Sequence, residues 1–261
     1  ELSNFFDLMH ALSLDTPNVI EAHVNAHLAI AFARLLEDDQ NRKASTKAST
    51  SLGGKNGSQP SSVDVHWLLE RISEYAPLER FATEFIDHGG IPLLNALSAR
   101  VAEHRQYGHL CITAAAALTE WTGFPDAFPW TVTSPSAHLC MGMLGSEALA
   151  DKVAATVIVT TCLRCAESAR QRKHNSDILK TVEVVTPLLS NLHPPLQRCL
   201  DLEGAAGPSA ADNPTMDRLL QYTLLALSEV AKEVGHAELV LSDGLTALQA
   251  LLFGGPLEAI S

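Results

Sequence analysis

The stretch HGGIPLLNALSARVAEHRQYGHLCITAAAALTEW, residues His88 to Trp121, decides the fold. It begins with a glycine pair, continues with an apolar segment headed by Pro92, breaks at polar residues around His104, and ends in an alanine-rich amphipathic run. Glycine commonly ends a helix and proline is tolerated in the first turn of the next, so the stretch predicts two helices folded back on each other. Such a pair cannot bury its apolar faces alone, and the chain must supply similar units.

Further copies of this unit follow in the chain. The start GGIPLLNAL (89–97) is matched by VVTPLLSNL (184–192) and DGLTALQAL (243–251), and more loosely by SPSAHLCMGML (134–144). The long helices that follow share the endings AAAALTEW, VTTCLRCA and LLALSEVA. Helical solenoid repeats have a period of about 40 to 47 residues. The equivalent positions in the four copies are Pro92, Ala137, Pro187 and Thr246. Successive positions are 45, 50 and 59 residues apart.

This order of glycine, short apolar helix, polar turn and long alanine-rich helix resembles the armadillo family. The resemblance is good for residues 81–121 and 216–253, moderate for 147–192, and poor before residue 62. It implies an all-α fold, a right-handed armadillo/HEAT-like α-solenoid of about four repeats that forms a single domain over residues 1–261.

Composition agrees with a helical protein and excludes several classes of function. The chain is 46% apolar but only 5% aromatic, and Ala and Leu, both strong helix formers, dominate the apolar set. A formal net charge of −12 argues against nucleic acid as the main partner. No apolar run reaches the roughly 18 residues that cross a bilayer. We expect an intracellular protein, cytoplasmic or nuclear, and because the chain opens at Glu1 we expect it to be cut from a longer one.

Local signals place further helices and two loops. The helices are expected over residues 135–144, 147–172, 178–192 and 216–234, with Ser146 and Ser176 as caps and Pro187 kinking or dividing the third. Residues 39–62 contain almost nothing apolar and are predicted to be a disordered insertion, and residues 203–215 a second flexible loop. The basic residues of the first loop could bind an acidic partner, or the loop could be a phosphorylated or simply flexible insertion.

The resemblance also implies a binding surface, because the third helices of armadillo repeats line a concave groove that binds extended peptides. The importin subgroup uses Asn and Trp there. The Asn position falls on Glu120, Cys165 and Glu229, and the Trp position on Ala116, Thr161 and Leu225, so classical nuclear-import cargo is not expected. Two acidic residues in the groove favour a partner segment bearing Lys or Arg, with merely solvated carboxylates as the alternative.

Three other features suggest chemistry or contacts. Trp130, at the end of the proline-containing segment FPDAFPW, is predicted to be an exposed partner anchor, whereas Trp67 and Trp121 are predicted to be core. The pair His23 and His27 lacks the Glu of HExxH and a third ligand, so surface or packing histidines are expected and no metal site. The five Cys lie mostly in predicted helices, and the CxxC of Cys162 and Cys165 falls inside one, so buried reduced thiols are expected.

We therefore predict a non-catalytic protein-binding scaffold within a larger intracellular complex, with no cofactor and no catalytic residue. An armadillo-like chaperone cofactor that clasps an Hsp70 nucleotide-binding domain is the alternative, and titration with an Hsp70 would discriminate the two. A metal-dependent hydrolase is the second alternative and would require the histidines to converge.

Overall fold

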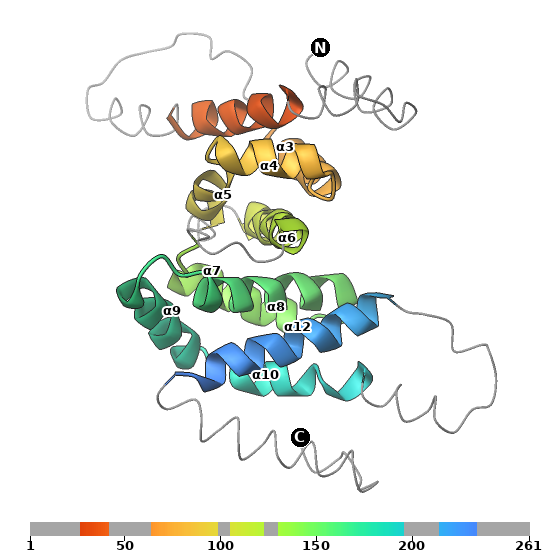
Figure 1. The fold of residues 1–261 in the computed structure, drawn as a ribbon, viewed down its shortest axis with the longest axis vertical. Coiled ribbons are helices and arrows are strands. Elements are labelled where there is room, and N and C mark those ends of the chain that lie inside the picture. Colours follow the sequence, from red (N-terminus) through yellow and green to blue (C-terminus); the bar gives the residue numbers. More distant parts are fainter. Residues whose placement is uncertain (1–26, 42–63, 99–104, 123–129, 196–213, 234–261) are drawn as a thin grey trace, which may run out of the picture.

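The structure is a computed structural model that describes residues 27–41, 64–98, 105–122, 130–195 and 214–233 (Figure 1). Within these ranges every regular element is a helix, which confirms the all-α prediction. An unlabelled helix covers residues 27–41. It is followed by α3 (Val65–Tyr75), α4 (Glu79–Asp87), α5 (Gly90–Ser98), α6 (Arg105–Thr122), α7 (Ser134–Leu144), α8 (Leu149–Arg164), α9 (Ala169–Thr181), α10 (Val185–Ser190) and α12 (Pro214–Ala231).

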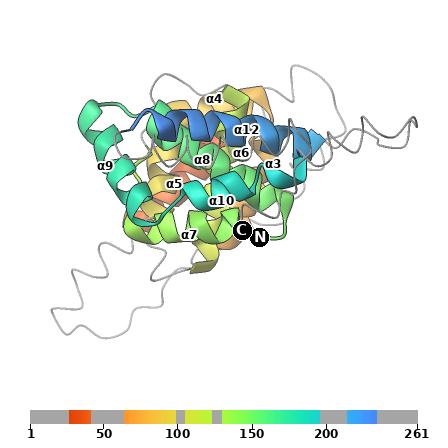
Figure 2. The ribbon, with the colours of Figure 1, turned by 90° about the horizontal axis from the view of Figure 1, so that it is seen from below.

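The helices follow one another along the long axis of the molecule in two rows (Figures 1 and 2). In the long row α3 packs on α6, α6 on α8, and α8 on α12. The short row contains α5, α7 and α10, which pack on α6, α8 and α12 of the long row, respectively. Helix α9 lies to one side, against α8 and α7. Helices α6, α8 and α12 are therefore each supported by a neighbour in the long row and by a short helix that precedes them in the chain.

Helix boundaries in the first half follow the local signals. The Asp64 side chain caps α3 by accepting hydrogen bonds from the N–H groups of His66 and Trp67, at 3.0 and 3.3 Å. Gly89 has φ of 78° between α4 and α5, a left-handed conformation that costs glycine little. Thr133 and Ser136 form a capping box at the start of α7, with a proline in its first turn as predicted.

The chain divides differently from the prediction between α8 and α10. The predicted helix 147–172 is two helices, α8 and α9, separated by a break at residues 165–168. Ser168, and not Ser176, caps α9, because its Oγ accepts a hydrogen bond from the Gln171 N–H at 3.1 Å. The chain changes direction at this capped start, so α9 lies beside α8 instead of continuing it.

The predicted helix 178–192 is also divided, but not by its proline. Helix α9 ends before Glu183, which has φ of 55°, and α10 begins two residues later. Pro187 lies in the first turn of α10, where its missing N–H has no intrahelical acceptor to lose. The predicted loops 39–62 and 203–215 lie mostly outside the described residues. Their described ends, 39–41 and 214–215, are helical.

The core runs through both rows and is richest in aromatic rings at the α3–α4 end. Phe32 contacts Trp67, Tyr75 and Phe81 edge-on, with ring centroids 5.9 to 6.2 Å apart. Phe85 stacks on Phe81 with centroids 5.6 Å apart. Trp67 is only partly buried but packs against the core as predicted, whereas the Trp121 side chain lies outside the described residues.

Substitution by alanine at two helical glycines is expected to change the stability of the fold in opposite directions. A Cβ on Gly90 would overlap the buried Phe85 ring, so Gly90→Ala should destabilise the fold by about 1–3 kcal/mol. Gly142 in α7 has open space around its Cα, so Gly142→Ala should stabilise the fold by about 0.5–1 kcal/mol through helix propensity. Chemical denaturation of both variants measures this, and equal shifts would contradict the packing around Gly90.

Candidate functional site

The four residues predicted to contact a partner do not line one open surface. Trp130 is 1% exposed and ranks first in size among the fully buried side chains, and Cys165 is equally buried. Glu229 has a side chain only 5% exposed, and that of Glu120 is 15% exposed. Trp130 precedes α7, whereas the others lie at the carboxyl ends of α6, α8 and α12.

The prediction of Trp130 as an exposed anchor is wrong. The prolines before it suggested a surface loop, but Trp130 is buried and its backbone is bonded to α9. The Asn175 Nδ2 donates to the Trp130 carbonyl at 3.3 Å, and the Val132 N–H donates to the Asn175 Oδ1 at 3.0 Å. The indole thus fills the interior beside this junction, where a partner cannot contact it.

The predicted groove is closed at most of its expected positions. Ala116, Thr161, Cys165 and Glu229 are buried. In helix α8 every residue from 153 to 163 is buried, and the helix packs against α6, α7 and α12. The positions aligned with peptide-binding residues of armadillo repeats therefore serve contacts between the helices of this chain.

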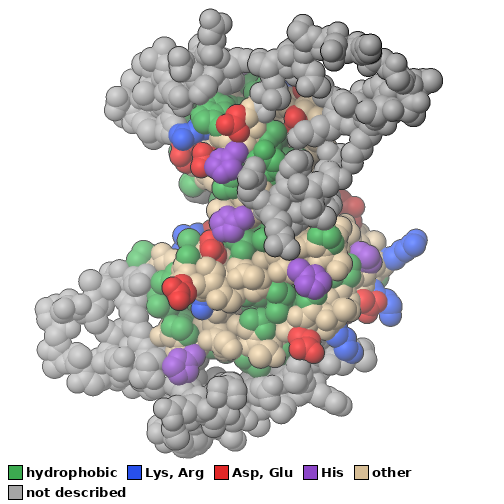
Figure 3. Space-filling view, turned by 180° about the vertical axis from the view of Figure 1, so that it is seen from behind, with side chains coloured by type: hydrophobic (Ala, Val, Ile, Leu, Met, Phe, Trp, Pro, Cys, Tyr) green, Lys and Arg blue, Asp and Glu red, His purple; other side chains and the backbone are tan. Residues whose placement is uncertain are grey.

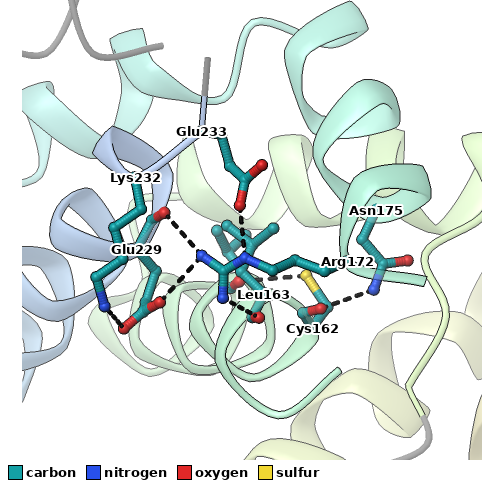
Figure 4. A network of polar contacts seen from close by, with 8 residues as sticks. Cys162, Leu163, Arg172, Asn175, Glu229, Lys232 and Glu233 are labelled. Carbon is teal, nitrogen blue, oxygen red and sulfur yellow. Dashed lines mark hydrogen bonds and ion pairs between the residues drawn. The ribbon is translucent and has the colours of Figure 1, made fainter. Parts of the chain in front are cut away.

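A polar cluster built around Arg172 occupies the carboxyl end of α8 (Figure 4). The guanidinium donates to the Leu163 carbonyl at 2.6 Å and to the Glu233 carboxylate at 2.5 Å. It also pairs with the Glu229 carboxylate at 3.3 Å, whose other oxygen accepts from Lys232 Nζ at 2.6 Å. A cation at this place satisfies carbonyls that lack intrahelical donors and opposes the negative end of the helix dipole.

Asn175 completes the connection between α8, α9 and the chain before α7. Its Nδ2 donates to the Cys162 carbonyl at 2.7 Å, in addition to the Trp130 carbonyl. All its bonds go to backbone groups of this chain. Arg172 and Asn175 therefore join α9 to α8, to α12 and to the chain before α7, and residues of this chain balance the charge of Glu229.

Glu120 is the one predicted residue whose charged group reaches the surface, and it too has an internal partner. Arg218 of α12 donates to it in a fork, Nε to Oε1 at 2.9 Å and Nη2 to Oε2. Tyr222 lies beside the pair; burial, and then the nearby Glu120 carboxylate, raise the pKa of Tyr222 to about 12. The carboxylate predicted to bind a partner's Lys or Arg thus binds an arginine of its own chain.

A Ser, an Asp and a His meet at the other end of α8, but in the wrong order for catalysis. Asp151 Oδ1 is 2.9 Å from His109 Nε2, and Asp151 Oδ2 accepts from the Ser146 hydroxyl at 2.9 Å. A nucleophilic serine must donate to the histidine so that the imidazole can accept its proton. Here the Asp stands between them, so the arrangement ties α6 to the start of α8.

The four cysteines that the structure describes are core residues, as predicted. Cys111, Cys140 and Cys162 are free and buried, and Cys165 is buried. Burial raises the pKa of Cys140 to about 12 and raises that of Cys162 as well, which keeps both as unreactive thiols at neutral pH. His27 is exposed and His23 lies outside the described residues. The described part of the chain contains no group of three His, Cys, Asp or Glu able to hold a metal ion.

Arg172, Asn175 and Arg218 were not singled out from the sequence. Ser168 and Gln171 carry the S-x-x-Q signature of a helix start, which would have placed Arg172 and Asn175 on a separate helix. No local signal marks Arg218, whose partner lies 98 residues away.

No family model matches the chain, and neither the curated proteins nor the solved structures contain a match. Membership of the armadillo family therefore stays a prediction. Among the helices that the structure describes, none combines the length and apolar character that a membrane span requires.

Proposed function

We propose that the chain is a non-catalytic scaffold that binds a partner protein, built as an armadillo-like array of helical repeats. The observation that carries this proposal is the pairing of rows, in which α6, α8 and α12 each pack on a short helix before them and on the preceding long helix. Stacked units of this kind gain surface in proportion to their number and bind partners along it. The step from array to binding is an argument by analogy of fold.

Two further observations support a binding role over a catalytic one. The polar clusters at both ends of α8 make bonds that connect helices, and the described thiols are buried. The buried free thiols of Cys111, Cys140 and Cys162 also suit a reducing compartment, which supports an intracellular location for the proposed scaffold.

Affinity purification of the tagged full chain from its source cell, followed by mass spectrometry, tests the proposal. A Trp130→Ala variant is the control, because loss of the buried indole is expected to disrupt the fold. Partners of the folded scaffold should be recovered with the wild-type chain and lost with the variant, whereas chaperones should follow the variant. Recovery of only those proteins that bind both forms equally would contradict the proposal.

A further inference from the structure

The Glu120–Arg218 contact connects helices α6 and α12. Glu120 lies near the end of α6 and Arg218 near the start of α12, and both helices pack on α8. The guanidinium approaches edge-on, so that Nε and Nη2 each face one carboxylate oxygen. This planar, two-point geometry suits a guanidinium and cannot be reproduced by an ammonium group.

The two partners differ in how firmly the fold holds them. The Glu120 side chain is 15% exposed on the 18-residue helix α6, next to the buried Leu118 and Thr119. The Arg218 side chain is 49% exposed. Glu120 is the less exposed member of the pair, so losing the cation costs the carboxylate more than losing the carboxylate costs the arginine. An exposed arginine gains no more than about 1 kcal/mol from such a pair, so Arg218 can be exchanged.

We propose that Glu120 is a receptor for an arginine side chain of a partner protein, and that Arg218 occupies this receptor in the free chain. The proposal rests on the scaffold function and names the chemistry of the partner, an arginine-bearing segment. Negative charge elsewhere on the chain, formally −12 in total, favours the approach of such a segment. The partner's arginine must displace Arg218, so the internal contact lowers the affinity of the free chain.

Fluorescence anisotropy with two labelled Gly/Ser peptides, one carrying arginines and one carrying lysines, tests the proposal on the full chain. Arg218→Ala should tighten binding of the arginine peptide by about threefold to fivefold, because the peptide no longer competes with Arg218 for the Glu120 carboxylate. The lysine peptide should gain less. Arg170→Ala removes the same charge from an exposed position on α9 and should leave both peptides near their wild-type affinity.

Two more variants separate the receptor from a general effect of charge or of folding. Arg218→Lys keeps the charge but cannot form the fork, and it should also tighten binding of the arginine peptide. Adding Glu120→Gln to Arg218→Ala should abolish the gain. The proposal is overturned if Arg218→Lys gives no gain, if Arg170→Ala gives an equal gain, or if the gain survives Glu120→Gln. Any of these results, with partners still recovered by affinity purification, would leave the scaffold function standing.

Discussion

Trp130→Ala is expected to destabilise the fold by about 3–5 kcal/mol, the range for truncation of a large buried aromatic side chain. The indole is 1% exposed, and the backbone that carries it is bonded to Asn175 on α9. The cavity left behind would lie where the segment before α7 meets α8 and α9. Urea denaturation followed by circular dichroism measures the loss.

Leu224→Ala is the matched control, because Leu224 is 50% exposed and is the one large apolar side chain that is exposed in the described part of the chain. Its loss should change the free energy of unfolding by less than about 1 kcal/mol. Unfolding of the two variants at similar urea concentrations would contradict the burial of Trp130 and would favour its prediction as an exposed anchor.

Arg172→Ala is expected to destabilise the fold by about 2–4 kcal/mol. It leaves the nearly buried Glu229 carboxylate with only Lys232 as a cation and leaves the Leu163 carbonyl without its donor. The expected loss is below that of a fully buried pair because Arg172 is itself partly exposed, and water screens what remains. Thermal and urea denaturation at neutral pH measure it.

Arg170→Ala is the control, two residues earlier on the exposed side of α9, and should cost less than about 0.5 kcal/mol. Combining Arg172→Ala with Glu229→Gln should cost less than the sum of the two single variants, because the second change removes the unpaired charge left by the first. Additive losses, or equal losses at residues 170 and 172, would contradict the role of Arg172 as the centre of the cluster.

Local sequence signals were sufficient for the fold class and for several helix boundaries. The glycine pair and Pro92 correctly separate α4 from α5, and the start of α7 follows from its proline and the preceding Thr133. Each of these signals acts within one helical turn, through a capping side chain or a backbone conformation, so the sequence around it is enough.

The errors concern contacts between residues distant in the chain. The backbone of the buried Trp130 is bonded to Asn175, which lies 45 residues away in the chain. No local sequence pattern predicts this contact. The resemblance to armadillo repeats assigned Glu229 and Glu120 to a groove. In the structure their carboxylates pair with Arg172 and Arg218, which lie on other helices. The S-x-x-Q signature at Ser168 marks the break between α8 and α9, which the predicted single helix over residues 147–172 does not contain.

Calorimetric titration of a partner recovered by affinity purification, purified and added to the full chain, tests the scaffold function most directly. We predict saturable binding with a fixed stoichiometry that is lost in Trp130→Ala. Heat that does not saturate, or equal binding by the chain with the disrupted core, would contradict a scaffold that binds through its folded array of helices.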